Sequence, residues 1–121
     1  MSELAKQIEQ FNNELATQVP QEVLEAFGKS IKDLKTKNIE EKSIKLGAIM
    51  PDFSLPNAKN EIIHSKEILK KGKMIIAFYR GSWCPYCNLE LKALQEKIKK
   101  INDKKVSLVA ISPQSPDNSL S

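Results

Sequence analysis

The feature of this sequence that most restricts its fold is a pair of short apolar runs separated by an amphipathic stretch. Residues 73–79 form one segment of strand length that is apolar after Lys73, and residues 106–111 form a second that is apolar except for Ser107. Helix signals begin at Cys84-Pro85 and continue to about residue 100, with apolar positions at helical spacing: Leu91, Leu94, Ile98 and Ile101. A strand, a helix and a strand over this distance predict a βαβ unit with parallel strands and a right-handed crossover. The chain is therefore expected to be an α/β protein whose two strands are covered on both faces.

Two amphipathic helices are predicted ahead of this unit. Apolar side chains recur at spacings of three and four over residues 2–19, and a second stripe follows Pro20 to about residue 34. We therefore expect a helical hairpin as an N-terminal extension over residues 1–40, and a separate α/β domain over residues 45–121. Two roles fit the apolar stripe, a dimer seam or docking on the chain's own core, and we expect the second.

The segment between the hairpin and the βαβ unit shows strand and turn patterns. Residues 52–55 and 61–64 alternate polar and apolar side chains and flank a turn-forming Asn-Ala-Lys-Asn segment, which predicts a small β-hairpin. Ser65 is predicted to cap a short helix that ends near residue 69. At the other end of the chain, residues 112–121 are expected to form a loop.

Length and composition exclude several classes of protein. A chain of 121 residues supports one domain, and 40% hydrophobic residues are enough for a core. The longest apolar run, residues 74–79, is far shorter than a membrane span, and acidic residues occupy the place of a secretory signal's apolar segment. Two cysteines do not make a disulfide scaffold. We therefore expect a cytoplasmic protein with no membrane partner.

The formal net charge is +4, and the basic excess lies in the second part of the chain. Residues 47–121 carry 12 basic and 7 acidic side chains. No aromatic residues alternate with these lysines as a single-strand platform would require, so we expect a solvated face and no nucleic-acid partner. Arg80 is the sole arginine beside 18 lysines, which indicates a site that needs its planar, forked cation.

The candidate catalytic residues are Cys84 and Cys87, at the junction of the first strand and the helix. The first turn of a helix has free backbone N–H groups and the positive end of the dipole, and both favour a thiolate. Pro85 suits the first helical position because its missing N–H would have no partner there. Cys87 lies on the apolar stripe and is expected to face the core, whereas Cys84 is expected at the exposed tip. Geometry alone therefore predicts Cys84 as the attacking thiol and Cys87 as the resolving one.

Other roles for the two cysteines remain open. They fit buried structural residues, although the strand–helix junction is the context in which a Cys-x-x-Cys pair indicates redox chemistry. A zinc site needs about four ligands, and His64 is the only histidine. An intersubunit metal or iron–sulfur cluster is a further, less favoured alternative. We expect no metal and no cofactor, and His64 is expected to be a strand-end residue.

Several segments resemble the peroxiredoxin family, which includes alkyl hydroperoxide reductases and thiol-specific antioxidants. The first is the site segment, Phe78-Tyr79-Arg80-Gly81-Ser82-Trp83-Cys84-Pro85-Tyr86-Cys87. The others are Leu46-Gly47 with Pro51-Asp52-Phe53-Ser54-Leu55-Pro56-Asn57 upstream and Val109-Ala110-Ile111-Ser112-Pro113-Gln114 downstream. Against the family's usual site, Arg80 holds a Pro position, Cys84 a Thr position and Cys87 the position of the peroxide-attacking cysteine. The alignment thus favours Cys87 as the attacking residue, whereas helix geometry favours Cys84, and the Cys-Pro-Tyr-Cys tetrad is also that of glutaredoxins.

The resemblance implies a thioredoxin-like fold of which this chain has the N-terminal part, because family members continue beyond the βαβ unit. It implies a thiol peroxidase that reduces hydrogen peroxide or organic hydroperoxides through Cys84 and Cys87, with a thioredoxin- or glutathione-type thiol as reductant. A thioredoxin- or glutaredoxin-like thiol–disulfide oxidoreductase is the first alternative, and a non-catalytic truncated fragment is the second. An unpaired edge on the strand at residues 73–79 would favour association, so a homo-oligomer is a possible state.

Overall fold

The computed structural model describes residues 2–116, and the chain divides into two compact units at Pro51. The first unit, Met1–Pro51, is helical, and the second, Asp52–Ser121, holds all of the strands that the structure describes. A loop is expected over residues 112–121, and its residues after Pro116 lie outside the described residues.

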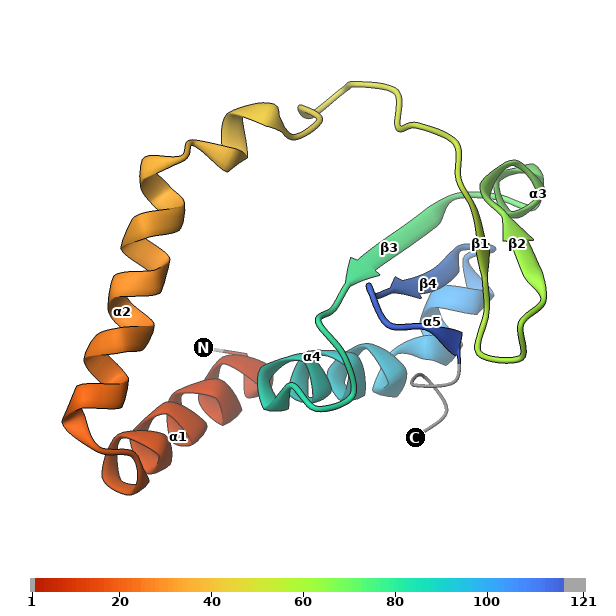
Figure 1. Cartoon of the computed structure of the whole chain (residues 1–121). Coiled ribbons are helices and arrows are strands. Elements are labelled where there is room, and N and C mark those ends of the chain that lie inside the picture. The colour runs from red at the N-terminus through yellow and green to blue at the C-terminus, as the bar shows by residue number, and fades with distance from the viewer. Residues whose placement is uncertain (1, 117–121) are drawn as a thin grey trace. The chain divides into compact units, whose positions relative to one another are not determined.

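The first unit consists of two helices and one 3₁₀ turn (Figure 1). Helix α1 spans Glu3–Gln18 and begins at Ser2, whose hydroxyl accepts a hydrogen bond from the Ala5 N–H at 3.1 Å. Helix α2 spans Gln21–Thr36, and the turn η1 spans Ile39–Lys42. The structure thus shows the two predicted helices, with the break between them at Pro20.

The second unit begins with the predicted β-hairpin. Strands β1 (Ser54–Pro56) and β2 (Ile62–His64) pair antiparallel, and the Asn57 side-chain oxygen accepts two backbone N–H groups within the turn. Helix α3 follows at once over Ser65–Lys70. The expectation that Ser65 caps this helix is wrong. Its buried hydroxyl instead accepts from the Phe53 N–H at 2.9 Å and ties the entry of β1 to the start of α3.

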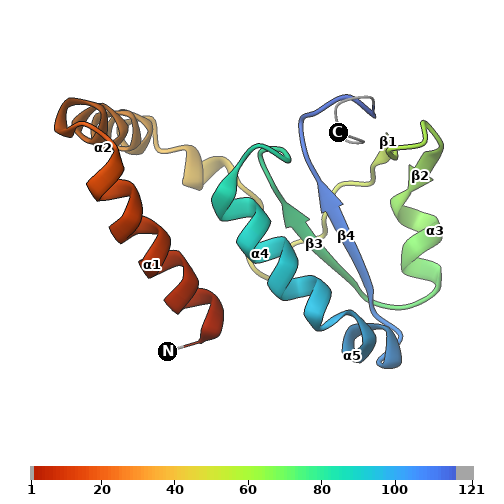
Figure 2. The ribbon, with the colours of Figure 1, turned by 90° about the horizontal axis from the view of Figure 1, so that it is seen from below.

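The βαβ unit is present as predicted, with strands β3 (Met74–Phe78) and β4 (Ser107–Ile111) parallel to one another. Figure 2 shows the connecting helices beside one face of this strand pair. The single helix expected to residue 100 is in fact two, α4 (Pro85–Glu96) and α5 (Ile98–Asp103). The break occurs at Lys97, where ψ is 2° and the N–H bonds to carbonyls two and three residues back, as in a tightened last turn.

The strands are less covered than their apolar sequences predict. Ile75 is 41% exposed and Phe78 is 76% exposed, so the expectation that β3 is covered on both faces is wrong. Within residues 2–116, β3 has β4 on one edge and no strand on the other. Cys84 is the one buried hydrophobic residue of the described chain.

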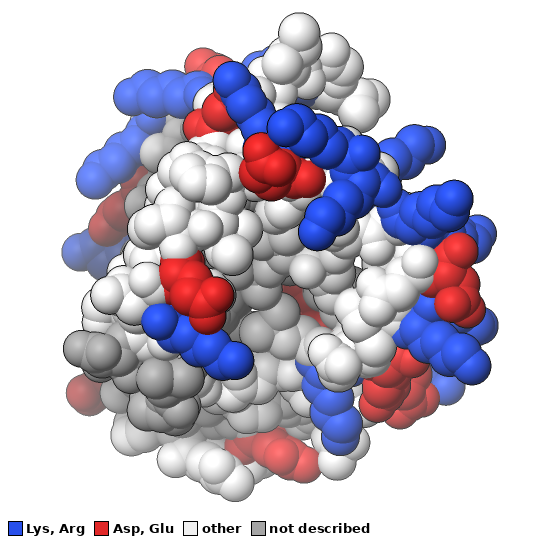
Figure 3. Space-filling view, turned by 90° about the vertical axis from the view of Figure 1, so that its right-hand side faces the viewer, with Lys and Arg blue, Asp and Glu red and all other residues white. Residues whose placement is uncertain are grey.

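Charged side chains of both signs share the surface of the molecule. On the face shown in Figure 3, Lys and Arg are interspersed with Asp and Glu. Among the described residues, Lys66 forms an exposed ion pair with Asp52 at 3.4 Å, and Lys70 forms one with Glu67 at 3.2 Å. None of the helices within residues 2–116 has the length and apolar character that a membrane crossing requires.

Candidate dithiol site

The two cysteines meet where β3 gives way to α4. Cys84 is the N-cap residue of α4 and Pro85 follows at the first helical position, as the sequence predicts. Three residues are just under one helical turn, so Cys87 returns to the same side and its Sγ lies 2.8 Å from that of Cys84. Both thiols are free. The pair is thus close enough for one sulfur to donate a hydrogen bond to the other and for a disulfide to form after oxidation.

The exposure of the two thiols is the reverse of the prediction. Cys84 is only 2% exposed, whereas Cys87 is half-buried. Helix periodicity applies to Cys87, which lies within α4. Cys84 precedes the helix, so periodicity does not predict its burial, which depends on the loop before it. That loop turns back on the helix start, since the Cys84 N–H donates to the Gly81 carbonyl at 3.1 Å. A reagent that reaches Cys84 must therefore pass the loop or approach beside Cys87.

Several groups around Cys84 favour its thiolate. Burial by itself raises the pKa of this thiol, but hydrogen bonds from the Cys87 side chain and N–H, the charge of Arg80 and the Tyr86 N–H lower it. The net result is a pKa below the ordinary value of 9.0. These are the two effects expected at a helix start, free N–H groups and nearby positive charge. Cys84 is therefore a thiol whose deprotonated form the local electrostatics favour.

Arg80 makes two contacts near the cysteine pair. Its backbone N–H donates to the Cys87 sulfur at 3.4 Å. Its guanidinium lies over the Trp83 ring, 4.7 Å from the ring centroid, in a cation–π arrangement. The contact with Cys87 comes from the backbone, so the prediction that a site needs the planar fork of this arginine stays a prediction. Trp83 itself is 60% exposed, so the stacked pair forms part of the surface around the dithiol.

Two polar side chains outside the cysteine motif hold the loop that precedes Cys84. The Ser82 N–H donates to the Gln114 side-chain oxygen at 3.2 Å, and the Asn88 side-chain nitrogen donates to the Ser82 carbonyl at 2.9 Å. Sequence reasoning missed both roles. Asn88 is four residues after Cys84, so helical spacing could have placed it near the loop, but no local pattern brings Gln114 to Ser82.

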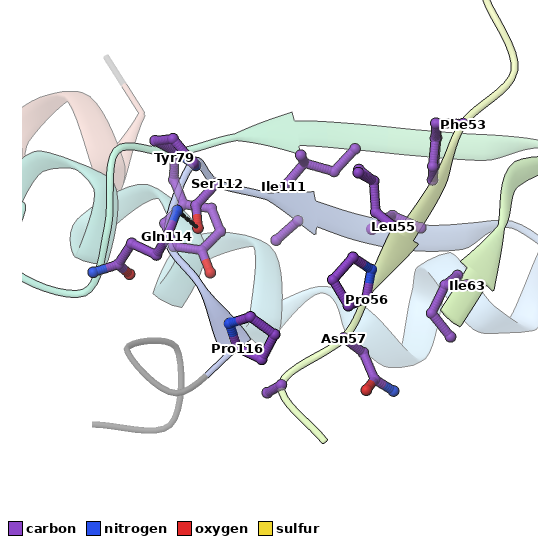
Figure 4. A pocket seen from close by; sticks show the side chains of 14 residues that line it. Phe53, Leu55, Pro56, Asn57, Ile63, Tyr79, Ile111, Ser112, Gln114 and Pro116 are labelled. Carbon is purple, nitrogen blue, oxygen red and sulfur yellow. Dashed lines mark hydrogen bonds between the residues drawn. The ribbon is translucent and has the colours of Figure 1, made fainter. Parts of the chain in front are cut away.

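A pocket of about 540 Å³ opens between the β-hairpin and the end of β4 (Figure 4). Its lining comes from β1, β2, β4 and residues beside them, and polar and apolar groups contribute to it about equally. Neither cysteine lines it, but Gln114 does, so the pocket and the loop before Cys84 have that side chain in common.

Metal ligands do not gather around the thiols. Within residues 2–116, no group of three His, Cys, Asp or Glu side chains is placed to hold a metal ion. His64 is at the end of β2, as expected, and its Nδ1 lies 2.7 Å from the Ser54 hydroxyl across the β-hairpin.

The AhpC/TSA family matches residues 46–121, which is more than half of the chain and includes both cysteines. The chain belongs to the AhpC/TSA family. The family resemblance drawn from the site and its flanking segments is thus confirmed, and so is the fold, because the β-hairpin and the βαβ unit are part of a thioredoxin-like architecture.

A protein of Helicobacter pylori (strain J99) that is named as a peroxiredoxin, bcp, is similar to this AhpC/TSA chain. The two are 33% identical over 78 residues, which are 64% of this chain and 49% of that protein. The chain thus spans about half the length of this relative. None of the solved structures matches the chain significantly.

Proposed function

We propose that this chain carries the reactive site of a thiol peroxidase, with Cys84 as the attacking thiolate and Cys87 as the resolving thiol. The observation that supports it most is the contact of the two sulfurs at 2.8 Å at the start of α4, where Cys84 has a lowered pKa. Membership of the AhpC/TSA family supports peroxide chemistry at this pair. Alignment with the family's usual site favours Cys87 as the attacking residue, so the choice of Cys84 depends on its burial at the helix start and its lowered pKa.

The reaction that this arrangement allows has two steps. The Cys84 thiolate attacks one oxygen of a hydroperoxide, the O–O bond breaks, and the sulfur is oxidised by two electrons to a sulfenic acid while the other oxygen leaves as an alkoxide and takes a proton. The Cys87 sulfur then attacks the Cys84 sulfur, forms the disulfide, and expels the sulfenic oxygen as water. In sum, two thiols and one hydroperoxide give one disulfide, one alcohol and one water.

An external thiol donor, either one dithiol or two monothiol molecules, must then restore the reduced pair by thiol–disulfide exchange and leave as a disulfide. We propose a thioredoxin- or glutathione-type thiol as this reductant and the cytoplasm as the compartment, because glutathione and thioredoxin keep thiols reduced there. We also propose that the edge of β3 without a strand partner in the described chain allows a homo-oligomer to form.

The test is oxidation of single-cysteine variants by one equivalent of hydrogen peroxide, followed by intact mass. The unchanged protein is expected to lose two hydrogens as the disulfide forms. Cys87→Ser is expected to gain one oxygen at Cys84, and Cys84→Ser to remain unoxidised on the same timescale. Peroxide consumption by Cys84→Ser at the unchanged rate would contradict the assignment of Cys84, and peroxide-inert wild-type protein would contradict the peroxidase proposal itself.

The second candidate is a thiol–disulfide oxidoreductase, and the hydrogen bond from Cys87 to a low-pKa Cys84 favours it equally. In that case the Cys84 thiolate attacks a disulfide sulfur, and Cys87 releases the mixed disulfide. Reduction of insulin or of a glutathione mixed disulfide measures this activity. If the rate constant with the disulfide exceeds that with peroxide under the same conditions, the oxidoreductase function is the better description.

A further inference from the structure

A side chain from beyond β4 reaches into the loop that precedes the dithiol. The Gln114 side-chain oxygen accepts the Ser82 N–H at 3.2 Å, although the two residues are 32 positions apart in the sequence. Gly81, next to Ser82, is buried and has φ of +156°. A Cβ on Gly81 would meet the Gln114 side-chain carbonyl carbon at 2.8 Å and the Trp83 ring at 2.5 Å. The Gln114 amide and the Trp83 ring therefore both pack against the bare Cα of Gly81.

The backbone fixes where Gln114 can reach. Strands β3 and β4 are in register up to the pair Phe78 and Ile111, and the Tyr79 N–H donates to the Ile111 carbonyl at 2.9 Å. The residues after each strand therefore leave the sheet side by side. The Gln114 N–H then donates to the Ser112 hydroxyl at 3.3 Å, a bond drawn in Figure 4, and this turn orients the Gln114 side chain.

The Ser82 peptide is held from two sides. Asn88 of α4 donates to its carbonyl at 2.9 Å, while Gln114 accepts its N–H. Asn88 belongs to the same helix as Cys87 and can only hold the loop to that helix. Gln114 is the side chain that ties the loop to the end of the sheet.

The loop carries the groups that stand around the thiols. Trp83 is next to Ser82 and has Arg80 stacked on its ring at 4.7 Å. Arg80 in turn donates its N–H to Cys87 and places a positive charge near Cys84. A change in the loop conformation would therefore move the charge and the hydrogen bonds that the dithiol experiences.

We infer that Gln114 is a positioning residue for the dithiol, which holds the Ser82 peptide and the Trp83 ring so that Arg80 stays beside Cys84 and Cys87. This inference deepens the proposed function, since it names a residue that sets the reactivity of the same site. It does not depend on the identity of the oxidant, because any reaction of Cys84 would be affected.

The test is the pH profile of Cys84 alkylation by iodoacetamide, read at peptide level, in Gln114→Met and in the unchanged chain. Methionine has a similar length and cannot accept the Ser82 hydrogen bond as an amide does. We expect the midpoint to move to higher pH and the rate at pH 7 to fall by about threefold to tenfold. The matched control is Gln95→Met, at an exposed position of α4. This substitution is expected to leave the alkylation profile of Cys84 unchanged.

Fluorescence of Trp83, the single tryptophan of the chain, provides the second measurement. Gln114→Met is expected to alter its emission, whereas Gln114→Glu, which keeps an oxygen acceptor, is expected to retain the unchanged emission. An alkylation profile of Gln114→Met that coincides with the unchanged protein would overturn the inference. Equal changes of emission in both variants would overturn it as well. Neither readout uses peroxide, so a peroxide-inert protein counts against the proposed function alone.

Discussion

The two units of this chain are built by different kinds of interaction. In the helical unit, side-chain hydrogen bonds such as that of the Ala5 N–H with the Ser2 hydroxyl and that of the Ser30 hydroxyl with the Phe27 carbonyl join residues three positions apart. In the second unit, local hydrogen bonds are joined by ones that cross long stretches of sequence, from the Phe53 N–H to the Ser65 hydroxyl and from the Ser82 N–H to the Gln114 side-chain oxygen. The reactive thiols are found only in the second unit. The comparison teaches that local rules build the helices and bring the two sulfurs together, whereas the loop beside the thiols is held by a contact that only tertiary structure provides, that of Ser82 with Gln114.

Glycine-to-alanine substitutions in the two units are expected to have opposite effects, and this is the largest contrast. In Gly81→Ala, the new Cβ meets Trp83 and Gln114 and the φ of +156° is unfavourable for alanine, so we expect a loss of about 1–3 kcal/mol in unfolding free energy. In Gly28→Ala of α2 nothing lies within 4 Å of the new Cβ, and a gain of about 0.5–1 kcal/mol is expected. Urea unfolding measures the change in unfolding free energy of each variant, and the rate of Cys84 alkylation measures the effect on the thiol. Equal effects at the two positions would show that the units do not differ in this way.

The pH dependence of Cys84 tests whether tertiary contacts prepare the site. Because the folded pKa of Cys84 is lower than 9.0, its alkylation rate is expected to reach its plateau at a lower pH in the folded chain than in urea. The stabilisation that accompanies this shift is complete above pH 9.0, the pKa of the unfolded thiol, and is lost as the pH falls through the folded pKa. The same midpoint with and without urea would mean that the fold contributes nothing to this thiol.

Serine-to-alanine substitutions give a smaller contrast of the same kind. Ser65 is buried, and Ser65→Ala leaves the part-buried Phe53 N–H without its side-chain acceptor, so a cost of about 1–2 kcal/mol is expected. Ser30→Ala removes an exposed hydroxyl that bonds back to its own helix, and a change of less than about 0.5 kcal/mol is expected. Thermal unfolding of the two variants provides the comparison. A larger loss from Ser30→Ala than from Ser65→Ala would reverse the distinction between the units.

The sequence predicted the elements because each leaves a local pattern. Residues 106–111 are apolar at strand length, and β4 is Ser107–Ile111. Alternation predicted the β-hairpin, and Pro20 separates the first two helices as expected. Spacing and the strand–helix junction predicted that Cys84 and Cys87 lie together, and their sulfurs do meet, while their catalytic role stays a prediction. These predictions depend on one or two turns of chain and on no distant contact.

The errors fall where distant contacts decide. Ser65 looks like a helix cap from its neighbours, but its hydroxyl serves Phe53, twelve residues away. Cys84 looks exposed at a helix tip but is only 2% exposed, and the loop before it is held at Ser82 by the distant Gln114. Gln114 has no local pattern that connects it with the dithiol, and only the parallel register of β3 and β4 brings it there.

The smallest expected effect tests how far the helical unit is independent of the site. Ser2→Ala removes the acceptor of the Ala5 N–H at the start of α1, and loss of such a cap costs about 0.5–1 kcal/mol of helix stability. Circular dichroism is expected to report a slightly less stable helix. The cap bonds only within its own first turn, so the alkylation profile of Cys84 is expected to be the same as in the unchanged chain. Ser43→Ala, which removes another local hydroxyl of this unit, provides a control for surface substitution. A shift in the Cys84 profile on Ser2→Ala would show that α1 influences the dithiol, and the division into a locally built unit and a chemically active one would then be wrong.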